Sequence, residues 1–189
     1  MADVQTPIRI VAVPGSVRPG NFTVKALGLV LDEIGKHTDI ALDVIDPAAM
    51  ALPLPGMADG SPATQDLIAR VNAATGVVLA TPEYHGSYSS VMKLVIENLG
   101  FPSVLAGKPI ALLGVAAGQI GAIKALEHLR SVCSHIGAIV LPGTVSVAGV
   151  QRRCLDEPTE RRIRDLTTLY VPRPVPQTRA AVLQFVQTH

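Results

Sequence analysis

Short runs of consecutive apolar residues alternate along this chain with segments whose apolar residues recur every three to four positions. A continuous apolar run suits a strand that is buried on both faces, whereas the wider spacing indicates an amphipathic helix. Strands that alternate with helices are typical of βαβ units and a parallel sheet. The pattern predicts five strands: Ile8 to Val13, Ile40 to Ile45, Gly76 to Ala80, Pro109 to Val115, and Ala138 to Leu141 with an extension through Val145 to Val147.

The same pattern predicts five helices. In the first, Leu27, Val30 and Ile34 form one apolar stripe, and Ser61-Pro62 is a start signal for the second. The helices are predicted over residues of about 22–36, 63–73, 89–99, 120–136 and 158–170. This order of elements predicts an α/β fold with a flavodoxin-like, doubly wound sheet of five parallel strands, in the order 2-1-3-4-5 with helices on both faces.

The length of 189 residues fits one domain. We therefore expect one flavodoxin-like domain over residues 1–171 and a Pro-rich tail over residues 172–189. The tail ends in an apolar segment, Ala180 to Val186, and we expect it to be an arm onto a partner subunit. The long segment Asp46 to Pro62 after the second strand either borders a site or an interface, or is a plain surface excursion.

Charge and composition exclude several kinds of partner. The formal net charge is +1, the pI is about 7.9, and no block of Lys or Arg occurs, which argues against nucleic-acid and membrane-surface binding. No apolar run approaches the roughly 20 residues of a membrane span, and the N-terminus lacks a signal pattern. We therefore expect a cytoplasmic protein that handles a small molecule. Cys133 and Cys154 show no C-x-x-C spacing and are interpreted as ordinary reduced cysteines.

A polar turn, Gly15-Ser16-Val17-Arg18-Pro19-Gly20-Asn21-Phe22-Thr23, leads from the first strand into the first helix. A helix N-terminus favours a phosphate, to which Ser16, Asn21 and Thr23 can add hydrogen bonds and Arg18 a charged fork. Alternatively, Asn21 or Thr23 only caps the helix and Arg18 is a solvated charge. The turn contains neither G-x-x-x-x-G-K-[ST] nor G-x-G-x-x-G, which disfavours a nucleoside triphosphatase and a Rossmann dehydrogenase.

A second binding loop is predicted where Pro and Gly interrupt the chain after the apolar run Gly76 to Ala80. Its sequence is Thr81-Pro82-Glu83-Tyr84-His85-Gly86-Ser87, and open α/β sheets hold cofactors at such carboxyl ends of strands. A third turn, with Gly114, Gly118 and Gly121, follows the fourth strand. These glycines serve either tight turn geometry or a close approach of the backbone to a planar ring, and the position at a strand end favours the ring.

Together these segments resemble the NADPH-dependent FMN reductase family, which includes chromate, quinone and azo reductases. The resemblance spans residues of about 8–150 and rests on the Gly15-Ser16-Val17-Arg18 turn, the Thr81 to Ser87 loop running into Met92-Lys93, the Gly118 turn and the segment Leu129 to Leu141. It implies that the first turn holds the FMN phosphate, that the second loop lies along the isoalloxazine ring, and that the third turn approaches the flavin edge. The implied cofactor-binding residues are Ser16, Arg18, Asn21, Phe22, Thr23, Pro82, Glu83, Tyr84, His85, Gly86, Ser87 and Gly118.

Several positions depart from the family pattern. Asn21 stands where Ser is usual, Leu94 and Glu97 differ in the helix after the loop, and His85 stands where Asn is usual. Asn21 keeps a donor, so phosphate binding is expected to survive. His85 is expected to alter the flavin potential or the choice of acceptor. Alternatively, it is a solvated or core-facing histidine of which only the backbone N–H matters.

The resemblance implies an NAD(P)H-dependent oxidoreductase with a ping-pong cycle. A hydride passes from NADPH or NADH to N5 of FMN, and the electrons then reduce a quinone, a free flavin, an azo compound or a metal oxyanion. Because the cofactor carries the chemistry, we expect no catalytic side chain and no metal site. His128, Cys133 and His135 are interpreted as incidental polar residues on a helix. The family also suggests a homodimer or homotetramer.

Two other classes of protein remain open. One is a flavodoxin-like electron carrier that binds FMN without oxidising nicotinamide, and the other is a flavin-free interaction module on the same fold. Carriers are typically acidic and sandwich the flavin between aromatic residues, whereas this chain is nearly neutral, lacks Trp and has three Tyr. The composition therefore favours the reductase.

Overall fold

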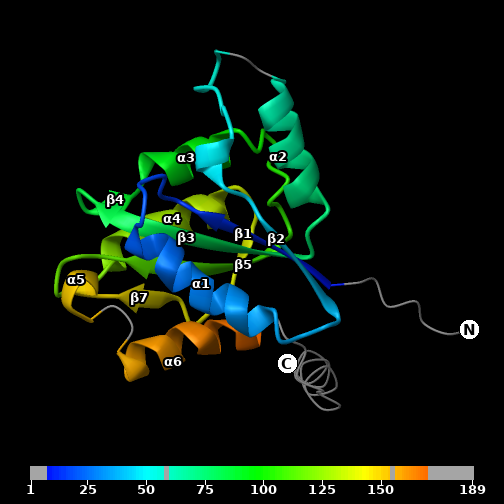
Figure 1. Cartoon of the computed structure of the whole chain (residues 1–189). Helices are drawn as coiled ribbons and strands as arrows, with labels where there is room; N and C mark the ends of the chain where they lie inside the picture. The colour runs from blue at the N-terminus through cyan, green and yellow to red at the C-terminus, as the bar shows by residue number, and fades with distance from the viewer. Residues whose placement is uncertain (1–7, 58–59, 154–155, 170–189) are drawn as a thin grey trace, which may run out of the picture.

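The computed structural model describes residues 8–57, 60–153 and 156–169. A parallel sheet in the order β2-β1-β3-β5-β6 forms its centre (Figure 1). The predicted flavodoxin-like, doubly wound α/β fold is thereby confirmed, with the predicted fourth and fifth strands corresponding to β5 and β6. These strands are β1 (Ile8–Pro14), β2 (Ile40–Val44), β3 (Gly76–Tyr84), β5 (Pro109–Val115) and β6 (Ile139–Val140).

The last strand of the sheet is divided in two. β6 pairs with the start of β5, where Pro109 lies opposite Ile139. A second piece, β7 (Val145–Val147), pairs with the end of β5, where Leu113 lies opposite Val145. The predicted extension is therefore a separate strand, and the turn between the pieces contains Gly143 at a φ of 80°.

Helices cover both faces of the sheet (Figure 1). One face carries α1 (Phe22–Ile34), α6 (Glu157–Asp165) and the 3₁₀ turn η2 (Leu166–Leu169). The other face carries α2 (Pro62–Asn72), α3 (Ser90–Glu97) and α4 (Ile123–His135), while η1 (Pro47–Ala49) and α5 (Val150–Arg153) are short connecting turns. The helix predicted from residue 120 begins only at Ile123, because Gly121 has a φ of 84°, which lies outside the helical region.

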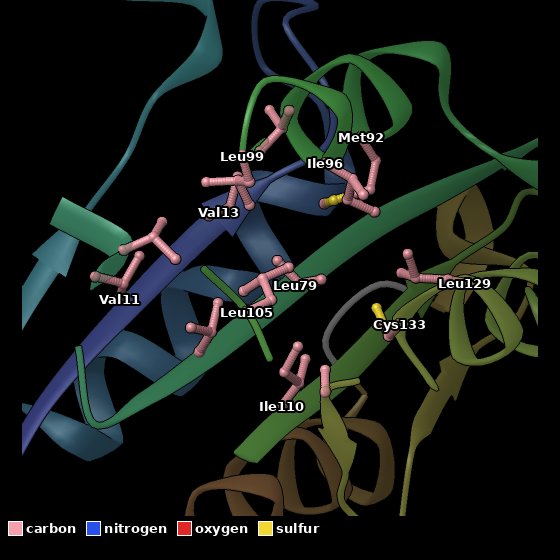
Figure 2. Packing of buried hydrophobic residues seen from close by; sticks show 14 of the residues in the cluster. Val11, Val13, Leu79, Met92, Ile96, Leu99, Leu105, Ile110, Leu129 and Cys133 are labelled. Atoms are coloured by element: carbon pink, nitrogen blue, oxygen red, sulfur yellow. The ribbon is translucent and has the colours of Figure 1, made fainter. Parts of the chain in front are cut away.

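Neighbouring residues of each strand pack into two separate cores. Val11 and Leu79 belong to the core under α2, α3 and α4, whereas Ile10 and Val78 belong to the core under α1 and α6. This alternation follows from the two-residue period of a strand, and it explains why the strands read as continuous apolar runs. Figure 2 shows the first core, in which sheet residues lie near Met92, Ile96, Leu99, Leu129 and Cys133.

The register of the sheet brings the ends of β1 and β3 together. Pro14 lies opposite Ala80, and the N–H of Gly15 donates to the carbonyl of Ala80 at 2.6 Å. A Cβ on Gly15 would lie 3.0 Å from that same oxygen, a tight contact that glycine avoids where the first turn begins beside β3. The two segments predicted to bind the cofactor therefore start side by side.

Three expectations from the sequence concern residues that the structure does not describe. The boundary at residue 171, the tail over residues 172–189 and Cys154 all lie outside the described residues. Within the described residues, no helix has the length and apolar character needed to cross a membrane.

Candidate functional site

The turn between β1 and α1 is shaped by Asn21. Its Oδ1 accepts the N–H of Val24 at 2.8 Å, and its Nδ2 donates to the carbonyls of Arg18 at 2.6 Å and Ser16 at 3.4 Å. The capping alternative therefore applies to this side chain, which is occupied by the turn itself. By tying the turn to the first helical N–H groups, Asn21 holds Ser16 and Arg18 at the N-terminus of α1.

Ser16 is 4% exposed, and its Oγ is the one buried side-chain oxygen or nitrogen without a hydrogen-bond partner among the described residues. Leaving a buried hydroxyl unpaired costs about 1–3 kcal/mol, so such an atom points to a missing ligand. A cavity of about 360 Å³ opens here, lined by Ser16, Arg18, Asn21, Asp46, Ala48 and neighbouring residues. A hydroxyl, a guanidinium and a helix N-terminus form a donor set that fits a phosphate.

The predicted loop after the third strand is in fact an extension of β3 and a hairpin. β3 continues to Tyr84 and turns back into β4 (Ser87–Tyr88), with Glu83 opposite Tyr88. Pro82 does not end the strand because it lies beyond Ala80, the last residue that pairs with β1, so its missing N–H leaves that pairing intact.

Two residues with positive φ make the hairpin turn. His85 has a φ of 51° and Gly86 a φ of 72°. Two consecutive positive values are what a type I′ turn requires, and Asn-Gly is its preferred sequence. Histidine tolerates this conformation better than most other residues with side chains. The departure from Asn at residue 85 thus preserves the turn while it changes the side chain.

Two side chains of the hairpin are held by α4. The Oε2 atom of Glu83 accepts the N–H of Ala125 at 3.0 Å, and the Oγ atom of Ser87 lies 3.0 Å from Nδ1 of His128. The hairpin is therefore anchored to the helix. The parts of the hairpin that can contact a ligand are therefore its backbone and the side chains of Pro82, Tyr84 and His85.

Residues from both predicted halves of the site line one crevice of about 340 Å³, whereas the predicted Ser16, His85, Gly86, Ser87 and Gly118 lie outside its lining. Its lining residues come from the first turn, the end of β3, the end of β5 and α5, and the guanidinium carbon of Arg18 lies 4.8 Å from the centroid of the Tyr84 ring. Arg18 thus joins the proposed phosphate end to the proposed ring end. The lining comprises Arg18, Asn21, Phe22, Thr23, Pro82, Glu83, Tyr84, Val115, Ala117, Val150 and Gln151.

Four of these lining residues were missed by sequence reasoning. Val115 and Ala117 stand at the end of a predicted strand, which was the signal that could have found them. Val150 and Gln151 reach the crevice only because α5 returns to the sheet after β7. No local sequence pattern predicts that α5 packs back against this end of the sheet.

The glycine turn after β5 serves mainly to pack the chain. A Cβ on Gly114 would lie 2.7 Å from Cβ of Ala122, so α4 can approach β5 only over glycine. Gly121 has a φ of 84°, and a Cβ there would collide with Oγ of Ser146. The tight-geometry alternative therefore holds for Gly121, whereas Gly114 lies within β5 itself and serves the packing of α4. Gly118 has open space around it, and a close approach to a flavin stays a prediction.

The polar residues along α4 have separate environments. His128 contacts Ser87, whereas Cys133 lies in the core, where burial raises the pKa of its thiol to about 12. Cys133 therefore stays protonated and unreactive at neutral pH. Within the described residues, no group of three His, Cys, Asp or Glu side chains is placed to hold a metal ion.

Comparison with known proteins identifies the family to which this crevice belongs. The sequence profile described as NADPH-dependent FMN reductase matches residues 8–151. The chain belongs to the NADPH-dependent FMN reductase family. This family uses FMN and NAD(P)H, so the chain is an enzyme of the FMN reductase and quinone reductase type.

The chain is also similar to individual proteins of known activity or structure. The chain is 32% identical over 133 residues to the NAD(P)H-dependent FMN reductase PA1204 of Pseudomonas aeruginosa, covering 65% of this chain and 68% of that one. It is 31% identical over 160 residues to a quinone reductase of Escherichia coli K12, covering 80% and 83%. The NADH:FMN oxidoreductase EMOB, solved in its apo form, shares the fold with a TM-score of 0.72 at 21% identity, covering 88% and 92%.

Proposed function

We propose that this protein binds FMN in the crevice between the Ser16–Arg18 turn and the Tyr84 hairpin, and that it reduces a small organic acceptor with NADPH or NADH. The observation that carries the proposal is the buried, unpaired Oγ of Ser16 at the N-terminus of α1. A phosphate oxygen supplies the acceptor that this hydroxyl lacks, and Arg18 supplies the opposite charge.

The residues of the crevice and of the cavity at Ser16 divide into two groups by their chemistry. Ser16, Arg18 and the amides at the start of α1 would hold the phosphate, with Phe22 and Thr23 beside them. Pro82, Tyr84 and the backbone N–H groups of residues 83–87 would lie along the ring, whose edge the Gly118 turn would approach. The apolar side chains of Val115 and Val150 would exclude water from this end.

FMN, when bound, supplies the redox chemistry by taking a hydride from NAD(P)H and passing the electrons to the acceptor. The protein side chains then bind and orient, and none is assigned a bond-making role. The same fold can also serve an electron carrier, which would take up FMN without reacting with nicotinamide.

We propose a quinone as the acceptor, with an azo compound as the second candidate. Relatives in the comparisons bear the names quinone reductase, 2-hydroxy-1,4-benzoquinone reductase and FMN-dependent NADPH-azoreductase. A flat aromatic acceptor also suits the neighbourhood of Tyr84 and Tyr88, since both rings line one cavity beside the crevice.

The experiment is to purify the protein, record its visible spectrum with added FMN, and add NADPH or NADH without oxygen. Flavin bound to the protein and bleached by nicotinamide, then reoxidised by a quinone, is the expected result. A protein that takes up no FMN overturns the proposal. If FMN binds but neither NADPH nor NADH bleaches it, the result would favour the electron carrier instead.

We also propose that a second copy of the chain covers the groove between α3 and α4, in the cytoplasmic homo-oligomer expected from the sequence. The groove has a volume of about 520 Å³, and its lining combines the apolar Ile96, Phe101, Val132 and Ile136 with the polar Lys93, Glu97, Ser131 and His135. Phe101 is 88% exposed, and a protruding ring in a groove of mixed character suits a two-fold contact in which each Phe101 enters the partner's groove.

The dimer is tested by light scattering of the wild-type protein and of Phe101→Asp. The wild type should have twice the mass of one chain and the variant the mass of one chain. Val44→Asp, which places the same charge on an exposed residue of the edge strand β2, is the matched control. A wild-type protein that stays monomeric at micromolar concentration contradicts this part of the proposal.

A further inference from the structure

His85 has a backbone conformation that its side chain does not favour. It is the one residue other than glycine with a positive φ among the described residues. Asparagine or glycine would satisfy the same turn at lower conformational cost. A residue held in a sparsely populated region is a reason to ask what its side chain does.

The imidazole of His85 stands at a cavity distinct from the crevice. This cavity has a volume of about 440 Å³ and shares three wall residues with the crevice, Arg18, Glu83 and Tyr84. The remaining walls are His85, Tyr88 and Ser90. His85 is exposed, and no hydrogen bond or ion pair holds its ring within the described residues. The imidazole is therefore free to meet a ligand beside the crevice.

Two positively charged side chains lie near the hairpin. Arg18 lies over the Tyr84 ring, and a Cβ placed on Gly86 would come within 3.6 Å of the Lys124 side chain. This arrangement favours a ligand with a negative charge.

The negative groups near the cavity are already engaged. Glu83 accepts the N–H of Ala125 at the positive end of α4, which offsets part of its charge. Lys93 and Glu97, which lie near Tyr88, form an ion pair with each other. Because Arg18 is assigned to the FMN phosphate, the positive charge that favours an anionic ligand beside the hairpin is that of Lys124.

We propose that His85 is a specificity-determining residue that selects planar aromatic acceptors carrying an anionic oxygen, such as a carboxylate, a sulfonate or an ionised hydroxyl. Tyr84 and Tyr88 supply flat apolar surface for the ring, and the imidazole N–H donates to the anionic oxygen. The inference rests on the proposed function, because the acceptor must reoxidise FMN bound in the adjacent crevice.

The reaction itself is unchanged by this assignment. NAD(P)H gives two electrons and one proton as a hydride, solvent gives the second proton, and a quinone becomes a hydroquinone. His85 binds the substituent of the acceptor and makes or breaks no covalent bond. Substitution of His85 should therefore change the relative rates with different acceptors, and it should change the reduction of FMN by NAD(P)H much less.

The test compares two acceptors on enzyme whose FMN has been reduced with a stoichiometric amount of dithionite, so that nicotinamide is not needed and no reductant other than FMN is left to reduce the quinone. Stopped-flow mixing with 1,4-naphthoquinone and with its 2-sulfonate gives two second-order rate constants for reoxidation. We expect the ratio of sulfonate to neutral quinone to fall about tenfold in His85→Asn, because the shorter amide does not reach the position from which the imidazole Nε2 donates and one hydrogen bond to a charged group is lost. His85→Lys, which supplies an N–H donor at the end of a long side chain, should retain most of the ratio.

The matched control is His37→Asn, because His37 lies between α1 and the start of β2, at the opposite ends of the strands from the crevice. Its ratio should equal that of the wild type. An unchanged ratio in His85→Asn, in enzyme that NADPH still reduces, overturns the inference alone. Failure of NADPH and NADH to reduce bound FMN overturns the proposed function, and a protein that takes up no FMN overturns both.

Discussion

The carboxylate of Glu83 caps helix α4 from a different element of the fold. Its Oε2 accepts the N–H of Ala125 at 3.0 Å, while Ala122, at the N-cap position itself, has no side-chain oxygen to offer. The end of β3 and the start of α4 are thus joined by a charge at a helix N-terminus. This contact sets the position of the hairpin that forms one wall of the crevice.

Replacing Glu83 by alanine should therefore destabilise the protein by about 1 kcal/mol, the usual loss for a helix cap. Glu83→Gln keeps an acceptor oxygen and should lose less. Urea unfolding checks both, with Glu127→Gln as the control because Glu127 is exposed on the same helix. Equal stability of wild type and Glu83→Ala would show that the start of α4 does not depend on this carboxylate.

The hairpin turn predicts opposite effects for its two residues. Gly86→Ala places a side chain at a φ of 72° and should cost roughly 1–2 kcal/mol. His85→Asn should raise the free energy of unfolding by a few tenths of a kcal/mol, because asparagine suits this conformation. Thermal or urea unfolding measures both. Gly118→Ala, in open space without a positive φ, is the control and should change little.

A stabilised His85→Asn would also bear on function. If that variant loses discrimination between acceptors while it gains stability, the histidine is retained at the expense of the turn, which is the usual relation between an active site and its scaffold. A variant that is neither more stable nor less selective would argue that residue 85 is unconstrained.

The sequence was sufficient for the sheet order and for the two halves of the crevice, because both follow strands whose apolar runs are unambiguous. It failed at Pro82, which was interpreted as the end of a strand. Whether proline ends a strand depends on the neighbouring strand, here β1, which stops pairing at Ala80. The roles of Glu83 and Gly114 depend likewise on where α4 packs against the sheet. The local sequence around each residue does not contain that information.

Ser16→Ala separates folding from cofactor binding. The substitution removes an unpaired buried hydroxyl, so the stability of the FMN-free protein should be unchanged or slightly higher. The affinity for FMN should fall about tenfold or more, since a hydrogen bond to a charged group contributes about 1.5–3 kcal/mol. Fluorescence titration of FMN and urea unfolding measure the two quantities.

Ser134→Ala, on the exposed side of α4, is the matched control for Ser16→Ala and should leave FMN affinity unchanged. Loss of stability in Ser16→Ala without loss of FMN affinity would mean that the hydroxyl serves the fold. That result would remove the observation on which the proposed phosphate site rests.

The ion pair between Asp43 of β2 and Arg70 of α2 predicts a dependence of stability on pH. Arg70 donates to Oδ1 and Oδ2 of Asp43 at 2.5 and 2.9 Å, and these hydrogen bonds hold the pKa of Asp43 below its usual value. A depressed pKa in the folded state gives stability that is present above the unfolded pKa of about 4 and is lost as pH falls through the folded value.

Arg70→Met should therefore unfold more easily than the wild type at pH 7, by about 1 kcal/mol for a partly exposed pair. The difference in free energy of unfolding between the two proteins should shrink as the pH falls below about 4, because Asp43 then becomes protonated in the folded state as well as in the unfolded state. Urea unfolding at pH 7 and near pH 3 provides the comparison. A difference that is the same at both pH values would assign the effect to the packing of the arginine stem instead of its charge.

Arg18 contacts the Tyr84 ring in the structure, and we propose that it also binds the phosphate of FMN. Arg18→Ala should weaken FMN binding by roughly 1.5–3 kcal/mol, the range for a hydrogen bond to a charged group. Arg18→Lys keeps the charge but loses the planar fork, so its affinity should lie between those of the wild type and Arg18→Ala. Titration with FMN and with riboflavin, which lacks the phosphate, locates the effect. If Arg18→Ala weakens both ligands equally, Arg18 acts through Tyr84 at the ring end; if it weakens only FMN, the guanidinium leaves the ring to bind the phosphate.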